Sequence, residues 1–199
     1  LEIIGDYTEQ EQDKFAKLLG LTILAFEEDP EQDFLGRIYM DFGIGKRTGQ
    51  FFTPYNISRM IATMLFIPNL KGEVEAKGFV RLNDPTCGAG CMFIAAANAA
   101  REVGVNPKQS ILFVGRDIDP VVAHMCYIQV SLLGLPAVIE VGDTIAAKVY
   151  ELFFTPFYVL FGWHRKRQQE TEREVTVTVP PQEEVLKIGK QLTLFDEVV

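Results

Sequence analysis

The chain has 199 residues, of which 48% are hydrophobic, and its formal net charge is −8. This length suits one domain with a tail, and the acidic balance argues against a protein that covers nucleic acid with a broad basic face. No apolar run approaches the ~20 residues of a membrane-spanning helix, and three cysteines without paired spacing argue against a disulfide framework or a zinc site. We therefore expect a cytoplasmic protein with neither a membrane segment nor a bound metal.

Residues 1–66 are expected to form an N-terminal helical segment. Apolar residues recur at helical spacing over 8–26, and the pattern appears again over 33–42. A basic, glycine-rich loop follows over 43–50, and Pro54 is well placed to open a third helix.

Beyond this segment, apolar strands alternate with helices. Strands are predicted over 79–83, 111–116 and 138–141, and helices over 90–103 and 120–133. Fully apolar strands joined by helices are typical of a buried parallel sheet. We therefore predict an α/β fold with a doubly wound parallel sheet over residues 67–163.

The pattern is weaker towards the C-terminus. Residues 146–152 are interpreted as a helical turn, and 153–161 form an aromatic run that is interrupted by Pro156. Residues 164–199 are predicted as a third part, with a charged segment, a Pro-Pro linker and a tail.

The turn after the first predicted strand is the strongest candidate for a binding site. Gly88 and Gly90 allow backbone conformations and close approaches that a Cβ would block. Asp84, at the end of the strand, can accept a hydrogen bond from a ligand ammonium group. The alternative is an ordinary turn between a strand and a helix, since glycine pairs occur in many turns.

Acidic residues also follow the other two predicted strands. Asp117 ends the second strand, where a carboxylate can accept both ribose hydroxyls of a nucleoside ligand, and Asp119 is the second choice. Asp119 before Pro120 is equally suited to cap the next helix. Asp143 follows the third strand and is either a ligand for an adenine amino group or part of a surface turn.

Two motifs together indicate a family. Gly-Gln-Phe-Phe-Thr-Pro at 49–54 and Asp-Pro-Thr-Cys-Gly-Ala-Gly at 84–90, in this order and spacing, resemble the N6-adenine DNA methyltransferases of the type I restriction–modification M-subunit kind and their small phage- and plasmid-borne relatives. The resemblance covers about residues 33–160.

This resemblance implies the S-adenosylmethionine-dependent methyltransferase fold and an S-adenosylmethionine site. The implied cofactor residues are Asp84, Pro85, Cys87, Gly88 and Gly90 in the turn, Gln50, Phe51, Phe52, Thr53 and Pro54 in a lid, Asp117 at the ribose and Asp143 near the adenine. For the lid, the alternative is that Phe51 and Phe52 simply pack in the core.

The chain departs from the family at the substrate side. Amino-methylating members carry Asn/Asp-Pro-Pro-Tyr/Phe after their fourth strand, and this chain has no such motif. Its nearest candidates are Thr155, Pro156 and Tyr158, although the threonine hydroxyl cannot replace a planar carboxamide. The chain is then a DNA adenine-N6 methyltransferase with a modified site and weak catalysis, or a non-catalytic module that binds cofactor or DNA. A plain hydrophobic strand over 153–161 is the further alternative.

The expected partners are DNA and a specificity subunit or the DNA sliding clamp. Lys46-Arg47 and the run from His164 to Arg167 are candidates for phosphate contacts, or else solvated charged faces. The tail resembles clamp-binding peptides through Gln191, Leu192, Leu194 and Phe195. Alternatively, these tail residues dock on their own domain.

Overall fold

The computed structural model describes residues 2–45 and 49–168. The chain divides into two compact units, residues 1–161 and 162–199, and the fold below is that of the first unit. The basic pair Lys46-Arg47 and the tail motif at 191–195 lie outside the described residues, so their roles stay predictions.

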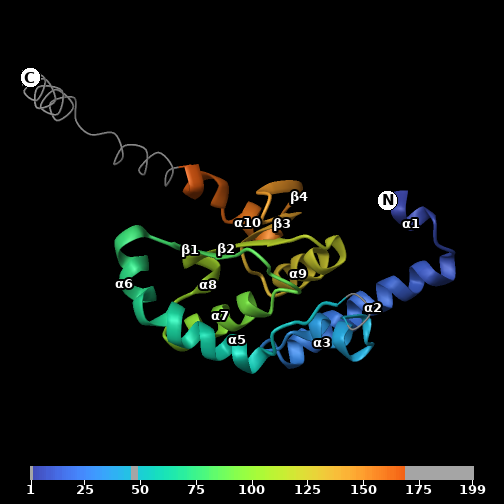
Figure 1. Cartoon of the computed structure of the whole chain (residues 1–199), viewed down its shortest axis with the longest axis horizontal. Helices are drawn as coiled ribbons and strands as arrows, with labels where there is room; N and C mark the ends of the chain where they lie inside the picture. Colours follow the sequence, from blue (N-terminus) through green and yellow to red (C-terminus); the bar gives the residue numbers. More distant parts are fainter. Residues whose placement is uncertain (1, 46–48, 169–199) are drawn as a thin grey trace, which may run out of the picture. The chain divides into compact units, whose positions relative to one another are not determined.

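The N-terminal segment is helical, as predicted. Its elements are α1 (Glu2–Gly5), α2 (Glu9–Glu28), α3 (Phe34–Asp41), α5 (Tyr55–Ile61), the π-helix η1 (Ala62–Phe66) and α6 (Ile67–Lys77) (Figure 1). α5, η1 and α6 follow one another without a break, so the boundary expected at residue 66 falls inside a continuous helical stretch. Within the described part of the chain, no helix is both long and apolar enough to cross a membrane.

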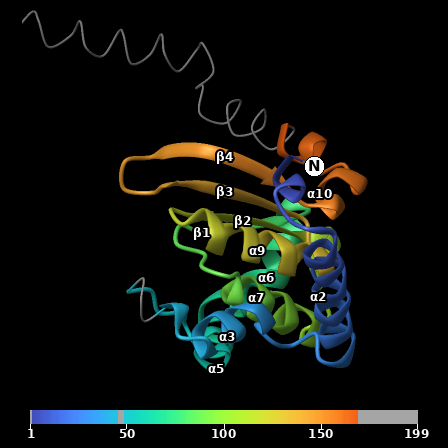
Figure 2. The ribbon, with the colours of Figure 1, turned by 90° about the vertical axis from the view of Figure 1, so that its right-hand side faces the viewer.

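The sheet has four strands in the order β1-β2-β3-β4, and only the first three are parallel. They are β1 (Val80–Asp84), β2 (Ile111–Asp117), β3 (Ala137–Asp143) and β4 (Lys148–Phe154). β4 pairs with β3 in the antiparallel sense, with Val138 opposite Phe154 and Asp143 opposite Lys148 (Figure 2). The α/β class is confirmed, but a wholly parallel, doubly wound sheet is not, and the helical turn expected over 146–152 is largely a strand.

Four helices connect or follow the strands: α7 (Cys91–Glu102), α8 (Pro107–Ser110), α9 (Pro120–Leu132) and α10 (Pro156–Leu160). α7 is the most deeply buried, because its alanines leave room for close contact with α5 and α6 on one side and α9 on another. Phe93 of α7 packs on Phe113 of β2 with ring centroids 5.4 Å apart. α9 packs on β2 and β3, and this core fixes the strand ends relative to one another.

A buried amide joins the helical segment to the sheet core. The Gln129 side chain of α9 is fully buried and accepts a hydrogen bond from Leu35 N at 2.9 Å. Its Nε2 donates to Asp33 Oδ1 at 2.8 Å and to Ala89 O at 2.7 Å. Asp33 Oδ1 also accepts from Gly36 N at 3.0 Å and so caps α3. Both N–H donors of this amide and one acceptor position of its oxygen are therefore used, and α3 and the glycine turn are held to the same helix.

We expect Asp33→Asn to change how stability depends on pH. Burial raises the pKa of the Asp33 carboxyl, and the hydrogen bond from Gln129 only partly opposes this. A raised pKa in the folded state gives stability that is present below the unfolded value and is lost as pH rises through the folded value. The asparagine keeps the acceptor oxygen and does not ionise, so the variant should gain stability relative to wild type as pH rises.

Urea unfolding at about pH 4 and about pH 8 measures this difference. Asp13→Asn on the exposed surface of α2 is the control, and its difference from wild type should not change with pH in this way. The same stability difference for Asp33→Asn at both pH values would contradict the argument.

Candidate functional site

The site lies at the carboxyl edge of the parallel strands. Because β1, β2 and β3 run in the same direction, Asp84, Asp117 and Asp143 end at one edge of the sheet. In Figure 2 this is the edge that carries the turn between β3 and β4, and α10 lies at the other end of the strands. A cavity of about 230 Å³ opens here, lined by Phe51, Phe52, Thr53, Ser58, Asp84, Thr86, Cys87, Gly88, Ala89, Cys91 and Met92. Residues of both predicted motifs, 49–54 and 84–90, therefore line one cavity.

The glycine turn has a backbone shape that depends on its glycines. Gly88 and Gly90 have φ values of 55° and 94°, in the left-handed region that side chains rarely adopt. A Cβ on Gly90 would also lie 2.8 Å from the Cys126 sulfur. The turn is closed by Gly90 N donating to Cys87 O at 2.9 Å, and Asp84 Oδ1 accepts from Thr86 N at 3.0 Å.

Asp117 holds the turn to the end of β2. Its Oδ2 accepts from Gly88 N at 3.0 Å, and its Oδ1 accepts from Asp119 N at 3.0 Å. A carboxylate offers about four acceptor positions, so two hydrogen bonds leave room for ligand hydroxyls. Asp119 caps α9 by accepting from Val121 N at 2.9 Å, as the alternative interpretation of this residue predicts.

The 50–54 segment covers the turn from the helical side. Phe52 stacks on Tyr39 with ring centroids 5.1 Å apart, whereas the Phe51 side chain is 75% exposed. Gln50 accepts from the Tyr39 hydroxyl at 2.7 Å and donates to Asp119 Oδ2 at 2.8 Å. Phe52 therefore packs partly as a structural residue, and Phe51 is the aromatic side chain that is available to a ligand.

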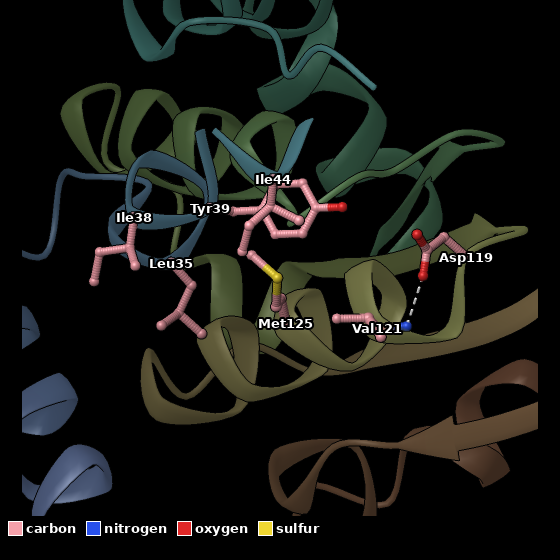
Figure 3. A pocket seen from close by; sticks show the side chains of 7 residues that line it. All are labelled: Leu35, Ile38, Tyr39, Ile44, Asp119, Val121 and Met125. Carbon is pink, nitrogen blue, oxygen red and sulfur yellow. Dashed lines mark hydrogen bonds between the residues drawn. The ribbon is translucent and has the colours of Figure 1, made fainter. Parts of the chain in front are cut away.

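A second, apolar cavity lies behind this lid, between α3 and the start of α9 (Figure 3). It measures about 420 Å³ and is lined by Leu35, Ile38, Tyr39, Ile44, Asp119, Val121 and Met125. Both Asp119 oxygens already accept hydrogen bonds, from Val121 N and from Gln50, which leaves an almost wholly apolar lining. The polar cavity at the glycine turn is therefore the better candidate for a charged ligand.

Burial sets the charge state of the groups in the turn. Burial raises the pKa of the Asp84 carboxyl, and the nearby Asp117 charge acts in the same direction. Burial also raises the pKa of the Cys91 thiol to about 12. A hydrogen bond with Cys87, together with burial, holds the pKa of the Cys126 thiol well above its usual value. The thiols stay protonated, which suits packing rather than nucleophilic chemistry.

The structure brings most of the predicted cofactor residues together. The predicted residues that line the cavity are Phe51, Phe52, Thr53, Asp84, Cys87 and Gly88. Two more, Pro85 and Gly90, belong to the same glycine turn. The lid residues Gln50 and Pro54 flank Phe51 to Thr53 in the chain, and Asp117 is hydrogen-bonded to Gly88 of the turn. Asp143 is different, because its Oδ1 accepts from Ala146 N at 2.9 Å and so closes the turn between β3 and β4. This contact fits the surface-turn alternative for Asp143.

Thr155, Pro156 and Tyr158 lie apart from the cavity. Thr155 follows β4 next to Ala137, at the start of β3, whereas the cavity is at the carboxyl edge. The Thr155 hydroxyl is fully buried, accepts from Ala137 N and donates to Leu135 O, each at 2.8 Å. It also caps α10 by accepting from Tyr158 N at 3.4 Å. This geometry makes Thr155 a structural cap and gives no support to a substrate-side role.

Three functional candidates were missed at the sequence level: Ser58, Asp33 and Gln129. Each is buried in the structure. The available signal was a polar residue on the otherwise apolar face of a predicted helix, as with Ser58 beside Ile61 and Ala62. The hydrogen-bond partners of such a buried polar residue, however, can come from distant parts of the chain, as in the Gln129 contact with Leu35. Local sequence patterns do not contain these partners.

The family model described as "N-6 DNA Methylase" matches residues 31–184. The chain belongs to this family. A methylase subunit of the type I restriction enzyme MjaIX from Methanocaldococcus jannaschii is 26% identical over 125 residues. That match covers 59% of the present chain and 20% of the relative, so the chain matches about a fifth of that protein's length. No solved structure matches the chain.

Family membership confirms the resemblance that the two motifs indicated. Both motifs lie inside the matched range, and they line one cavity in the structure. The cavity is smaller than the roughly 300–1,000 Å³ of typical ligand pockets. A ligand of ordinary size would therefore extend beyond this cavity.

We expect Thr155→Val to lower the free energy of unfolding by about 1–3 kcal/mol, because Ala137 N and Leu135 O lose a buried partner. Denaturant unfolding measures the loss. Thr155→Ser keeps the hydroxyl and is the matched control, which should lose clearly less. A Thr155→Val chain as stable as wild type would show that these hydrogen bonds contribute nothing to the fold.

Proposed function

We propose that the chain is the cofactor-binding domain of an S-adenosylmethionine-dependent DNA adenine-N6 methyltransferase. The observation that carries the proposal is the polar cavity at the carboxyl edge, where the glycine turn, the Asp84 carboxylate and the lid residues meet. Family membership supports the reaction class, and the relative's description as a type I methylase subunit supports a specificity subunit as partner.

The residues present fit this cofactor in chemistry and charge. S-Adenosylmethionine carries an ammonium, a carboxylate and a sulfonium, so it is a net cation. The edge offers carboxylates on Asp84 and Asp117. Burial raises the pKa of the Asp84 carboxyl because it disfavours the charged form, and a cationic ligand next to Asp84 would offset this cost of ionisation. Gly88 and Gly90 keep the backbone open to close approach, because a Cβ at either position would require a strained conformation.

Each residue has a distinct role in this proposal. Asp84 accepts from the ligand ammonium, and Asp117 uses its remaining acceptor positions for the ribose hydroxyls. Thr53 and the exposed Phe51 ring cover the ligand from the lid side. When bound, the cofactor would supply an electrophilic methyl group for transfer to the adenine N6 nitrogen.

Substrate-side residues are expected from outside the described part of this chain. Among the described residues, the nearest match to the family motif lies at the opposite edge of the sheet. We therefore assign cofactor binding to this chain alone and methyl transfer to the chain together with a partner that provides the adenine-binding groups.

We expect the chain alone to bind S-adenosylmethionine in calorimetry, and Asp117→Ala to weaken binding about tenfold or more, because ribose hydrogen bonds to a carboxylate are lost. Asp6→Ala removes the same charge from an exposed site and is the control. A tritium-methyl assay on unmethylated DNA tests transfer. No binding by wild type, or an Asp117→Ala variant that binds like wild type, would overturn the cofactor assignment. Efficient transfer by the chain alone would contradict the need for a partner.

The affinity for S-adenosylmethionine should rise with pH in the acid range. Burial raises the pKa of the Asp84 carboxyl, so this group is protonated and unable to pair with the ammonium until pH exceeds its raised value. Asp84→Asn should bind more weakly and lose most of this dependence, because the amide does not ionise. Calorimetry across about pH 4 to 8 measures both effects. A parallel pH dependence in wild type and Asp84→Asn would assign it to another group.

A further inference from the structure

Ser58 places a hydroxyl without a hydrogen-bond partner at the wall of the glycine-turn cavity. The residue lies on α5, is fully buried and lines the cavity together with Asp84 and Cys91. Within the described residues, Ser58 Oγ and Ser131 Oγ are buried hydroxyls that make no hydrogen bond. Of these two side chains, Ser58 is the one that lines this cavity.

The missing hydrogen bond is unusual for a hydroxyl on a helix. Ser and Thr side chains in helices commonly donate to the carbonyl four residues earlier. Thr22 donates in this way to Leu18 O at 2.9 Å, and Thr63 donates to Arg59 O at 2.8 Å. Ser58 does not, although its own backbone N–H donates to Pro54 O at 3.1 Å. Its hydroxyl therefore keeps a donor for something inside the cavity.

No protein group at the cavity is a good acceptor for this hydroxyl. The Ser58 hydroxyl is close enough to the Cys91 sulfur to lower the pKa of this thiol, but burial outweighs that weak contact, raises the pKa to about 12 and keeps Cys91 neutral. A thiol sulfur is a weak acceptor. Leaving a buried hydroxyl unpaired destabilises the folded chain. A ligand with an anionic oxygen would remove this penalty on binding.

We propose that Ser58 is a cofactor-binding residue whose hydroxyl donates to the carboxylate of the amino-acid end of S-adenosylmethionine. This inference rests on the proposed function, in which Asp84 takes the ammonium of the same end. The two side chains line one cavity from different elements, Ser58 from α5 and Asp84 from the end of β1. Together they recognise both charges of a zwitterion, which distinguishes an amino-acid end from a simple amine or acid.

The test is Ser58→Ala in the full chain, with Ser131→Ala as the matched control. Both changes remove a buried, unpartnered hydroxyl from a helix, but only the first lies at the cavity. Thermal unfolding should show both variants to be as stable as wild type or more stable, because the unpaired group is removed. Calorimetry should show Ser58→Ala binding S-adenosylmethionine and S-adenosylhomocysteine roughly tenfold more weakly, and Ser131→Ala binding them like wild type.

A shorter ligand locates the contact. 5′-Methylthioadenosine keeps the nucleoside and sulfur but lacks the carboxylate and ammonium, so Ser58→Ala should bind it like wild type. An equal loss of affinity for this ligand would overturn the assignment to the amino-acid end. Unchanged affinity of Ser58→Ala for S-adenosylmethionine would overturn the inference and leave the proposed function intact. If the wild-type chain binds no S-adenosylmethionine, the proposed function fails and the role of Ser58 fails with it.

Discussion

The side-chain amide of Gln129 is the contact on which the site depends. From one position on α9 it bonds α3 through Leu35 and Asp33, and the glycine turn through Ala89. The turn between Gly88 and Gly90 has few hydrogen bonds of its own, so its position is set from outside. The lid is set by the same helix, since Gln50 bonds Asp119 at its start. Turn and lid thus share one reference element, and the cavity between them keeps its shape for that reason.

The carboxyl edge brings several carboxylates together. Asp84, Asp117, Asp119 and Asp143 all lie at or just beyond strand ends that meet there. Such an edge attracts a cationic ligand and repels phosphate groups. Basic side chains are the groups that position a protein on the phosphate backbone of DNA. None of the residues that line the described cavity at the glycine turn is basic.

The parts of the fold that the sequence predicted well are those with a local physical cause. The first four positions of β2 and the first three of β3 are apolar because both faces of the sheet are covered there, and the turn needs glycines because its φ values are positive. β4 was missed because it is exposed along nearly its whole length, so no apolar alternation marks it. The capping position of Thr155 is not evident from the sequence for a related reason: a short motif does not show which edge of the sheet it reaches. The role of Gln129 depends on contacts over 90 residues apart in the chain, such as the one with Leu35.

The π-helix η1 has a consequence for how this chain compares with its relatives. Its turn is closed by Ile67 N–H bonding Ala62 O, five residues back, so it holds one residue more than an α-helical turn. The extra residue rotates α6 by about 100° relative to α5, which lets Ser58 face the cavity while Leu70 faces the core. A relative with an unbroken α-helix here would need a one-residue gap between positions 61 and 67. Without that gap, an alignment anchored on β1 would shift the whole lid segment by one position. Each lid residue would then be aligned with a residue of the relative that occupies a different place in the structure.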